Sequence, residues 1–246
     1  MTAVSEGALL LAIDTSTSRT VLALGRSDGT LLAADTWEAG HRHVEELLPR
    51  LDGFLEGRGM DRAALARLSG IVVGTGPGAF TGLRVGIATA KALAVAFGRP
   101  LVAIGSGAAL IAAAADVDPS TDPARLLVLM PAGPTGRYVV TLAGTRLVIG
   151  DDVPDLASGA VPVAVDLAAR APEAAVARGR AAIDRFPGML LRLGAARLAA
   201  GGADDPAEVV PEYVSLPRGA AGAAGEPRSV GAAGAEIVTT WSPARP

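Results

Sequence analysis

Short apolar runs separated by glycine-rich turns dominate the first hundred residues of the 246-residue chain. Two of these runs, Ala8–Ile13 and Ile71–Val73, read as buried strands. An Asp-Gly hairpin signal at Ser27–Gly29 follows the second run, so antiparallel pairing comes before any helix, unlike in a Rossmann domain. The strands predicted in this half are Ala8–Ile13, Thr20–Gly25, Thr30–Trp37, Ile71–Val73 and Leu101–Ile104.

Apolar residues at helical spacing predict helices between these strands. After His43, the 3.6-residue period predicts an amphipathic helix that either kinks at Pro49 or starts near Leu48. Alternation of strands with helices indicates an α/β sheet with helices packed on it. The apolar positions of the first helix are Val44, Leu47, Leu48, Leu51 and Leu55, and further helices are predicted at Asp61–Leu68, from Gly78 to Gly98 and at Ser106–Ala115.

The second half repeats the order of strands and then helices in a shorter form. The Asp- and Pro-rich segment Asp116–Pro123 precedes it. We expect an N-terminal lobe at residues 1–104, a smaller C-terminal lobe at 105–216 and a disordered Gly/Ala/Pro-rich tail at 217–246. The strands of the second half are predicted at Leu126–Met130, Tyr138–Leu142, Arg146–Ile149 and Val161–Val165, and its last helix at Met189–Ala200.

Composition narrows the classes of function. Half of the residues are hydrophobic but only 3% are aromatic, and the net charge is −3, so the chain lacks the basic field and the stacking residues of a nucleic-acid surface. There is no cysteine, which excludes disulfides and thiolate zinc sites. No basic leader and no uninterrupted apolar stretch of membrane-spanning length is found, so we expect a soluble cytoplasmic protein that does not bind membranes.

A glycine-dense turn links the Ile71–Val73 strand to the long helix. Gly82 is followed by Leu83 and Arg84, which excludes a Walker loop, and no acidic residue follows to hold a ribose, which argues against NAD. Asp14, at the end of the first strand, either meets the phosphates and magnesium of ATP or caps its own backbone. The residues expected near a nucleotide are therefore Asp14, Gly74, Gly76, Pro77 and Gly78.

Small residues recur every fourth position along the long helix, at Gly82, Gly86, Ala90 and Ala94. Positions four apart lie on one face of a helix. Glycine inside a helix costs about 1 kcal/mol relative to alanine, so such a stripe indicates a neighbour that comes very close. That neighbour is either another element of this chain or a helix of a second protein.

Catalytic patterns are missing. Gly105-Ser106-Gly107 does not have the glycine spacing of a nucleophile elbow. His41 and His43, the only histidines, have no third ligand nearby except Glu45 and Glu46 and make a poor metal site. We therefore expect no catalytic residue and no metal ligand in this chain.

Three stretches together resemble the TsaB (YeaZ) family, over Leu9–Ile104. The resemblance implies an α/β fold of the actin, sugar-kinase and heat-shock-ATPase (ASKHA) class, with two mixed-sheet lobes that each carry packed helices. It also implies a non-catalytic scaffold subunit of the complex that transfers threonylcarbamoyl to N6 of the adenosine next to the anticodon in tRNA. The stretches are Leu10–Ser16, His43 with Leu47-Leu48-Pro49, and GTGPGAFTGLRVGIATAKALA from Gly74 to Ala94.

The family resemblance also implies the partners. The catalytic paralogue, TsaD, binds metal through a His-x-x-x-His, whereas the matching segment Leu101–Leu110 has no histidine. We expect this chain to form a heterodimer with that paralogue, and a TsaE-type ATPase to join the complex. ATP or ADP and metal are expected on those partners rather than on this chain. Contact with tRNA is expected to be only indirect. The family pairs through its first two helices, here the Val44–Leu55 helix and the helix of the small-residue stripe, and we expect a homodimer through the same face when the partner is absent.

Two alternative functions remain to be considered, together with one difference from the family's common sequence. An autonomous ATPase or small-molecule kinase of the same fold is the alternative suggested by Asp14 and the glycine loop. An endopeptidase is not expected, because neither a metal site nor a triad can be assembled. Pro131–Tyr138 stands where the family commonly carries an Asp-Ala-Arg-Arg-like segment, which removes the basis for a role of that loop in nucleotide or third-subunit contact.

Overall fold

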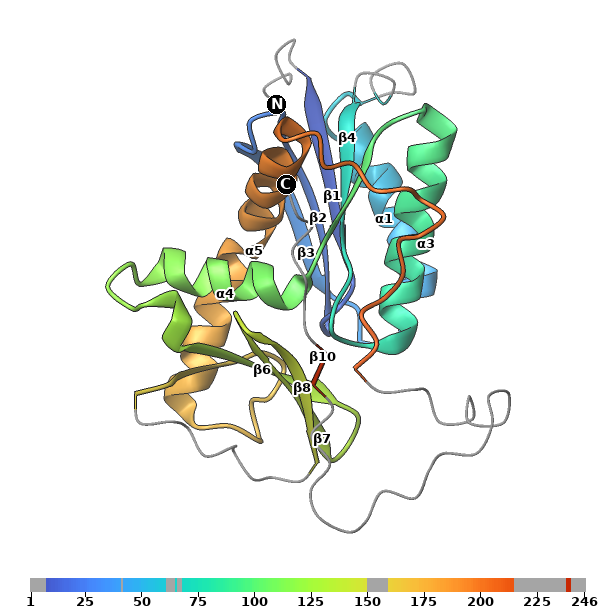
Figure 1. The fold of residues 1–246 in the computed structure, drawn as a ribbon. Helices are drawn as coiled ribbons and strands as arrows, with labels where there is room; N and C mark the ends of the chain where they lie inside the picture. Colours follow the sequence, from blue (N-terminus) through green and yellow to red (C-terminus); the bar gives the residue numbers. More distant parts are fainter. Residues whose placement is uncertain are drawn as a thin grey trace.

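Two five-stranded mixed sheets, each with packed helices, make up the computed structural model of the chain (Figure 1). The structure describes residues 8–40, 42–60, 65, 68–149, 159–214 and 238–239. The predicted fold class, an α/β protein with two mixed-sheet lobes, is confirmed.

The first sheet has the strand order β3-β2-β1-β4-β5. Its first three strands form an antiparallel meander, and β1 then pairs in parallel with β4, which pairs in parallel with β5. The predicted hairpin closes as expected, with Gly29 at φ +87° and the Arg26 N–H donating to Thr30 O at 2.9 Å. The strands are β1 (Leu9–Asp14), β2 (Arg19–Arg26), β3 (Leu31–Glu38), β4 (Leu68–Gly74) and β5 (Leu101–Ile104).

The second sheet repeats this topology. Its first strand pairs antiparallel with the second, the second antiparallel with the third, and the first in parallel with the fourth, as β1 does with β4. A short fifth strand lies in the segment predicted to be disordered, and the rest of residues 217–246 is outside the described residues. The strands are β6 (Leu126–Ala132), β7 (Gly136–Thr141), β8 (Gly144–Ile149), β9 (Val161–Ala164) and β10 (Val238–Thr239).

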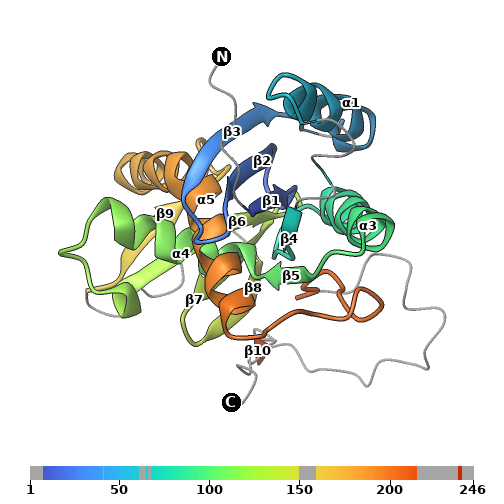
Figure 2. The same ribbon diagram turned by 90° about the horizontal axis from the view of Figure 1, so that it is seen from above.

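Helices cover both faces of the first sheet (Figure 2). Side chains alternate along β1, so that Leu9, Leu11 and Ile13 pack toward α1 and α3, while Leu10 and Ala12 pack toward α4 and α5. This explains why β1 reads as a continuous apolar run. The helices are α1 (His43–Glu56), α3 (Phe80–Phe97), α4 (Ser106–Val117) and α5 (Glu173–Ala199), with a 3₁₀ turn at Pro123–Arg125.

Two predicted helix boundaries need correction. Helix α1 begins at His43 and carries Pro49 in its interior, so a start near Leu48 is wrong. Most of the predicted Asp61–Leu68 helix lies outside the described residues, and Leu68 itself is the first residue of β4.

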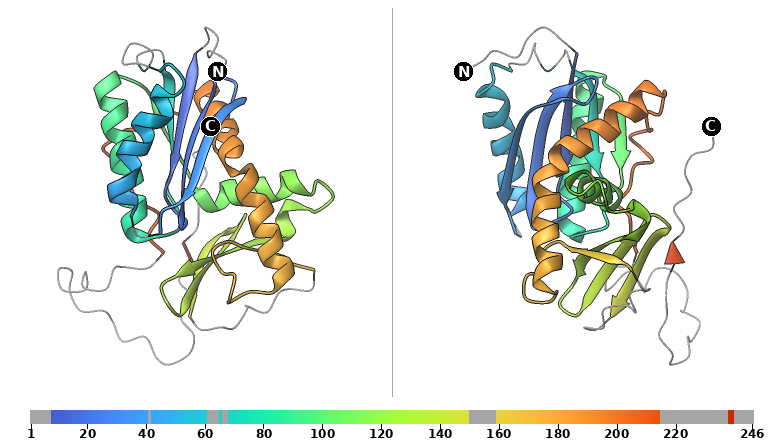
Figure 3. Two further views of the ribbon diagram at one scale, coloured as in Figure 1. Left: turned by 180° about the vertical axis from the view of Figure 1, so that it is seen from behind. Right: turned by 90° about the vertical axis from the view of Figure 1, so that its left-hand side faces the viewer.

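Helix α5 is much longer than its predicted span, Met189–Ala200, because it begins at Glu173. Pro187 and Gly188 lie in the middle of the helix, and both residue types disfavour helix interiors. The sequence pattern therefore predicted only the part of the helix that follows them. The helix bends along its length (Figure 3, right). Its first half packs on β9 through Gly179 and its second half on β4 through Gly194, so the two lobes share one helix.

The chain after α5 returns to the first sheet. The Asp204 N–H donates to Leu101 O, and the Glu212 N–H donates to Thr75 O, each at 2.8 Å. The predicted division at residue 104 lies between the two sheets, and these contacts cross it.

Among the described helices, α3 is the one long and apolar enough to cross a membrane by length and composition. In this fold it lies along β4 and β1 and buries its small-residue side against them. A helix that covers a sheet can also be long and apolar, so the packing of α3 on the sheet explains its length and its apolar composition.

Candidate functional site

Asp14 lies completely buried at the end of β1. One carboxylate oxygen accepts hydrogen bonds from the N–H and the hydroxyl of Ser16, at 2.8 and 2.7 Å, and the other accepts one from Ser106 Oγ at 2.5 Å. Burial raises the pKa of the Asp14 carboxyl, and its hydrogen bonds with Ser106 and Ser16 act in the opposite direction. Asp14 therefore joins the β1–β2 turn to the start of α4.

The glycine loop wraps around this carboxylate. A side chain at Gly74 would overlap Asp14 Oδ2, and one at Gly78 would overlap the carbonyl of Ser16. Three loop N–H groups are used inside the chain: Thr75 donates to Ile104 O, Gly76 to Ser106 Oγ and Ala79 to Ser16 O, all at 2.9 Å. The glycines thus permit close packing of the loop against β1.

These residues do not fit the phosphates of a nucleotide. A phosphate loop presents free N–H groups to the anion, and a magnesium-binding carboxylate faces the metal. Here the N–H groups of Thr75, Gly76 and Ala79 are satisfied within the chain, and Asp14 has no exposed surface. Of the two interpretations of Asp14, backbone capping is the one that the geometry favours.

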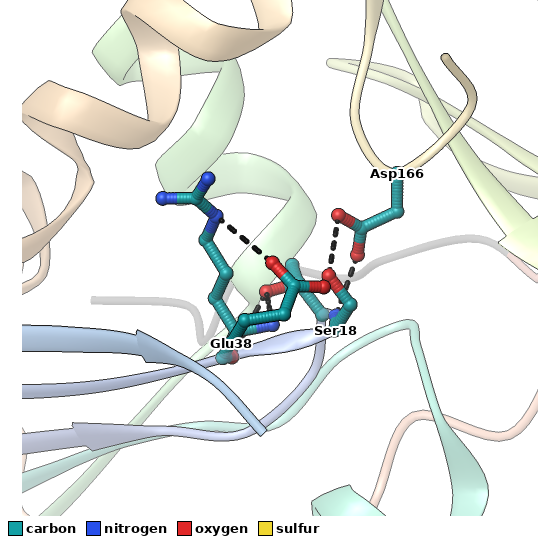
Figure 4. Close-up of polar contacts among 5 residues, drawn as sticks. Ser18, Glu38 and Asp166 are labelled. Carbon is teal, nitrogen blue, oxygen red and sulfur yellow. Dashed lines mark hydrogen bonds and ion pairs between the residues drawn. The ribbon is translucent and has the colours of Figure 1, made fainter. Parts of the chain in front are cut away.

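A second polar contact joins the two lobes. Ser18 donates to Asp166, in the loop after β9, through its N–H at 2.5 Å and through its hydroxyl at 2.8 Å (Figure 4). Beside it Arg19 and Glu38 form an exposed ion pair at 3.6 Å. Neither Ser18 nor Asp166 belongs to a pattern that the sequence analysis recognised, since 148 positions separate them.

A cavity of about 550 Å³ opens next to this contact. Its walls come from the β1–β2 turn and the end of β3 in one lobe, and from the loop after β9 and the first half of α5 in the other. Charged side chains of both signs line its rim, namely Arg19, Glu38, Asp166, Arg180 and Asp184.

The small-residue stripe of α3 is buried against this chain itself. Gly82, Gly86, Ala90 and Ala94 are all buried. A side chain at Gly86 would overlap Thr15 Oγ1, and one at Gly82 would overlap the Thr15 carbonyl and press on the His43 ring. The close neighbour is therefore an element of the same chain, and the prediction that these four residues form the partner surface is wrong.

His43 is part of the interior. It is 3% exposed, and its Nδ1 lies 2.7 Å from Thr20 Oγ1, so it packs at the start of α1. His41 lies outside the described residues. Within the described parts of the chain, no three His, Asp or Glu side chains gather as metal ligands.

Helix α1 also buries most of its predicted interface residues. Leu47, Leu51 and Leu55 belong to the core between the helix and the first sheet. Val44 and Leu48, four residues apart, are 59% and 60% exposed and lie together on the outer side. The predicted partner surface is thus reduced on α1 to these two residues.

The outer side of α3 also carries small residues, Thr81, Ala88 and Ala92, together with Arg84 and Val95, a feature that the sequence analysis missed. Thr81, Arg84, Ala88, Ala92 and Val95 are exposed and follow helical spacing. Val95 is 72% exposed. With α1 beside it on the same face of the sheet (Figure 2), α3 offers a surface that a further helix can approach closely.

The segment Pro131–Tyr138, which differs from the sequence common in the family, forms the β6–β7 hairpin. Gly133 takes φ +74° at its turn, and Pro131 pairs with Arg137 across the ladder. Arg137 is 1% exposed, so it is part of the lobe interior rather than of a binding loop.

A half-buried acid, Glu212, connects the glycine loop to the second sheet. Thr145 Oγ1 donates to Glu212 Oε1 at 2.6 Å, while the Glu212 N–H bonds the loop at Thr75. Burial raises the pKa of Glu212, and the Thr145 hydrogen bond lowers it. This contact makes the segment after α5 a strap between the two lobes.

Comparison with known proteins gives consistent results. Residues 37–186 match the family model described as tRNA N6-adenosine threonylcarbamoyltransferase, TsaD. A protein of that description from Sphingopyxis alaskensis is 32% identical over 169 residues, which are 62% of this chain and 48% of the relative. The Escherichia coli tRNA threonylcarbamoyladenosine biosynthesis protein TsaB is 35% identical over 96 residues, 39% of each chain.

A solved structure extends the likeness over most of the chain. The structure, from Pseudomonas aeruginosa, is described as an uncharacterized protein with similarity to peptidase YEAZ, and it matches with a TM-score of 0.60 and 25% identity. The match covers 85% of this chain and 100% of that one. By contrast, the chain spans less than half the length of the curated relatives described above.

Proposed function

Since the chain belongs to the family of tRNA N6-adenosine threonylcarbamoyltransferase (TsaD) and its TsaB (YeaZ) relatives, we propose that it is a non-catalytic subunit of a tRNA threonylcarbamoyladenosine-forming complex. It acts by forming a heterodimer with a TsaD-type catalytic paralogue. A TsaE-type ATPase completes the complex, and tRNA is contacted through the partners. The protein works in the cytoplasm.

The outer face of α1 and α3 is the observation that carries this proposal. Val44 and Leu48 expose apolar side chains that the fold does not need for its own core, beside the small outer side of α3. Apolar surface exposed in this way favours association. In the absence of the paralogue, the same face forms a homodimer.

The interior supports a non-catalytic role. Asp14 and the Gly76 N–H both bond the Ser106 hydroxyl within the chain. The segment Leu101–Leu110 lacks the histidines expected of the catalytic paralogue. ATP or ADP and metal then belong to the partner subunits. Purified chain that transferred threonylcarbamoyl to tRNA without a partner would refute this part of the proposal.

The alternative of an autonomous ATPase or small-molecule kinase can be tested directly. Titration of the isolated chain with ATP up to millimolar concentration, followed by calorimetry, is expected to show no binding. Saturable binding, with hydrolysis that Asp14→Asn abolishes, would replace the scaffold proposal with this alternative.

The interface is tested by co-purification with the paralogue from the same organism. Leu48→Asp places a charge on the exposed apolar face and is expected to weaken the heterodimer at least about tenfold, or about 1.4 kcal/mol. The matched control is Leu142→Asp, which changes an equally apolar side chain, 55% exposed, near the β7–β8 turn of the other lobe.

Both variants change surface residues, so both are expected to fold, as thermal unfolding can verify. Equal binding by Leu48→Asp and wild type would remove the face from the proposal. A substitution at Gly86 is unsuitable for this test, because its side chain would collide with Thr15 inside the protein and disturb the fold itself.

A further inference from the structure

Strand β8 would form one outer edge of the second sheet if the sheet consisted of its four longer strands alone. An outer strand presents a row of backbone N–H and C=O groups that can pair with a further extended segment. In this protein β10 takes that place and lies antiparallel beside β8 (Figure 1). Val238 pairs with Arg146, and Thr239 pairs with Thr145. The C-terminal part of the chain thus adds a strand to its own sheet.

The corresponding outer strand of the first sheet, β3, is protected by charge. Its Asp35 and Glu38 each form an ion pair with an arginine, at 3.9 and 3.6 Å. Charged side chains along an outer strand oppose the addition of another strand. In β8, Arg146 is the one charged residue, and leucine, valine and isoleucine follow it at 147–149. The β8 edge therefore lacks the acidic residues that protect β3.

Strand β10 covers only a part of this edge. Its two residues stand opposite Thr145 and Arg146, and among the described residues no strand lies beside 147–149 on this side. Ile149 at the end of β8 is 68% exposed. Hydrogen bonds of two residue pairs can exchange with water, because each gives only a small net gain in stability. The edge thus has room for a longer extended segment, and β10 can be displaced from it.

The sequence around β10 favours strand addition. Residues 237–240 are Ile, Val, Thr and Thr, and all four are β-branched. Side chains of this kind favour extended backbone and pack well on a pleated surface. The preceding part of the tail is instead rich in glycine and alanine. The β-branched run is therefore the part of the tail that suits a sheet edge.

The connection to β10 begins and ends close to one residue of β8. Thr145 Oγ1 donates to Glu212 at 2.6 Å, and Glu212 lies two residues before Val214, the last described residue of the strap. Thr145 also pairs with Thr239. A connection that returns to its own starting point keeps the tail strand near the edge at an effective concentration on the order of millimolar. Pairing within one chain is therefore favoured over pairing between two copies at lower protein concentrations.

We propose that the outer edge of β8 is a peptide-binding site and that the C-terminal tail is its occupant within the same chain. The site takes an extended, β-branched segment and holds it by backbone hydrogen bonds, as in other cases of strand addition. The tail covers the edge, so a segment of another protein must displace β10 before it can pair there. The site belongs to the second sheet, so it does not depend on the heterodimer proposed for α1 and α3.

The pairing is tested by a disulfide trap, because the chain contains no cysteine of its own. Arg146→Cys with Val238→Cys places two thiols on directly opposed residues, whose spacing in an antiparallel pair suits a disulfide. The matched control is Arg146→Cys with Ser229→Cys, which lies in the tail outside β10. On mild oxidation of the full chain, we expect a cross-linked monomer to form at least about tenfold faster than in the control.

Two results would overturn this part of the proposal. Equal rates of cross-linking in the two variants would show that β10 has no preferred place beside β8. A disulfide-linked dimer in place of the monomer would show that the occupant is the tail of a second copy. Thermal unfolding verifies that both variants remain folded.

Displacement is tested with full-length protein and a fluorescent peptide of residues 235–243. Neighbouring residues of a strand point their N–H groups to opposite sides, so Val238→Pro with Thr239→Pro removes one ladder donor whichever residue carries it. The matched control, Ala223→Pro with Ala224→Pro, adds the same two prolines outside β10. By fluorescence anisotropy, we expect the β10 variant to bind the peptide at least about tenfold more tightly than wild type and the control.

The peptide experiment also has results that would overturn the proposal. Equal affinity of wild type and the β10 variant would show that the tail does not cover the edge. Absence of binding to the β10 variant would remove the peptide-binding site itself. A peptide with proline at both β10 positions is expected not to bind, and binding as tight as that of the unchanged peptide would exclude backbone pairing as its cause.

Discussion

At the residue scale, Asp14 stands out because a carboxyl group is costly to bury in its charged form. Its oxygens accept three hydrogen bonds from Ser16 and Ser106, which compensate part of this cost. Desolvation still dominates and raises the pKa of the Asp14 carboxyl above its usual value of 3.8. The folded state therefore binds this proton more tightly than the unfolded state does.

This shift predicts a pH dependence of stability. The contribution of Asp14 is complete below its unfolded pKa of 3.8 and is lost as pH rises through the raised folded pKa. In Asp14→Asn the amide can donate to Ser106 and does not ionise. We expect urea unfolding to show wild type losing free energy of unfolding relative to Asp14→Asn as pH rises above about 4.

Asp28 in the β2–β3 hairpin gives a control of opposite sign. Hydrogen bonds from Thr30 lower the pKa of its exposed carboxyl, so its contribution is present above the unfolded pKa and is lost as pH falls through the lowered value. Asp28→Asn is thus expected to differ from wild type in the opposite direction with pH. A pH-independent difference between wild type and Asp14→Asn would contradict the assignment to Asp14.

At the element scale, α3 shows that one helix can carry two small-residue faces with different roles. The inner face, with Gly82 and Gly86, lets the helix lie close to the β1–β2 turn at Thr15. The outer face, with Ala88 and Ala92, is exposed. A small-residue stripe by itself therefore does not say whether its neighbour belongs to the same chain.

Two glycine-to-alanine changes in helices separate packing from backbone entropy. Gly86→Ala places a methyl group onto Thr15 and is expected to lower the free energy of unfolding by about 1–3 kcal/mol. Gly53→Ala in α1 has nothing within 4 Å of the added methyl and is expected to raise it by about 0.4–1 kcal/mol. Chemical denaturation measures both, and equal effects of the two changes would argue against the intrachain packing of α3.

At the scale of the whole molecule, residues of both lobes form one continuous hydrophobic core. Helices α1 and α3 cover one face of the first sheet, but α5 from the second half covers the other (Figure 2). Arg197 near the end of α5 adds a polar tie, because it donates to Ala103 O at 2.6 Å and pairs with Asp204. The first sheet is thus completed by a helix whose Arg197 lies 94 positions after the β5 residue that it bonds.

A fragment of residues 1–104 tests this dependence. It keeps the first sheet with α1 and α3 but loses α5, which leaves an apolar sheet face in water. We expect no cooperative thermal unfolding and a poorly dispersed amide NMR spectrum, in contrast to the full chain. A well-dispersed spectrum from the fragment would show that the first lobe folds independently.

Local pattern was enough to predict most of the secondary structure. Turn chemistry predicted the hairpin at Ser27–Gly29, and a short apolar run predicted the bounds of β5. The alanine-rich segment predicted α3. Each of these signals comes from residues close together in the sequence. The α/β class followed from the alternation of strands with helices, and the ASKHA fold came from the resemblance carried by the motifs at Leu10–Ser16 and Gly74–Ala94. The first half of α5 escaped prediction because Pro187 weakens the same local signals that predict a helix.

The sequence by itself determined which segments form strands and helices, and which family they belong to. Only the tertiary structure decided which face of α3 is buried, that the glycine loop encloses Asp14, and that Ser18 meets Asp166. The physical reason is that propensity and periodicity are local, whereas these contacts depend on how the sheets and helices pack. Thr15 and Gly82 of the α3 contact are 67 positions apart, and Ser18 and Asp166 are 148 apart.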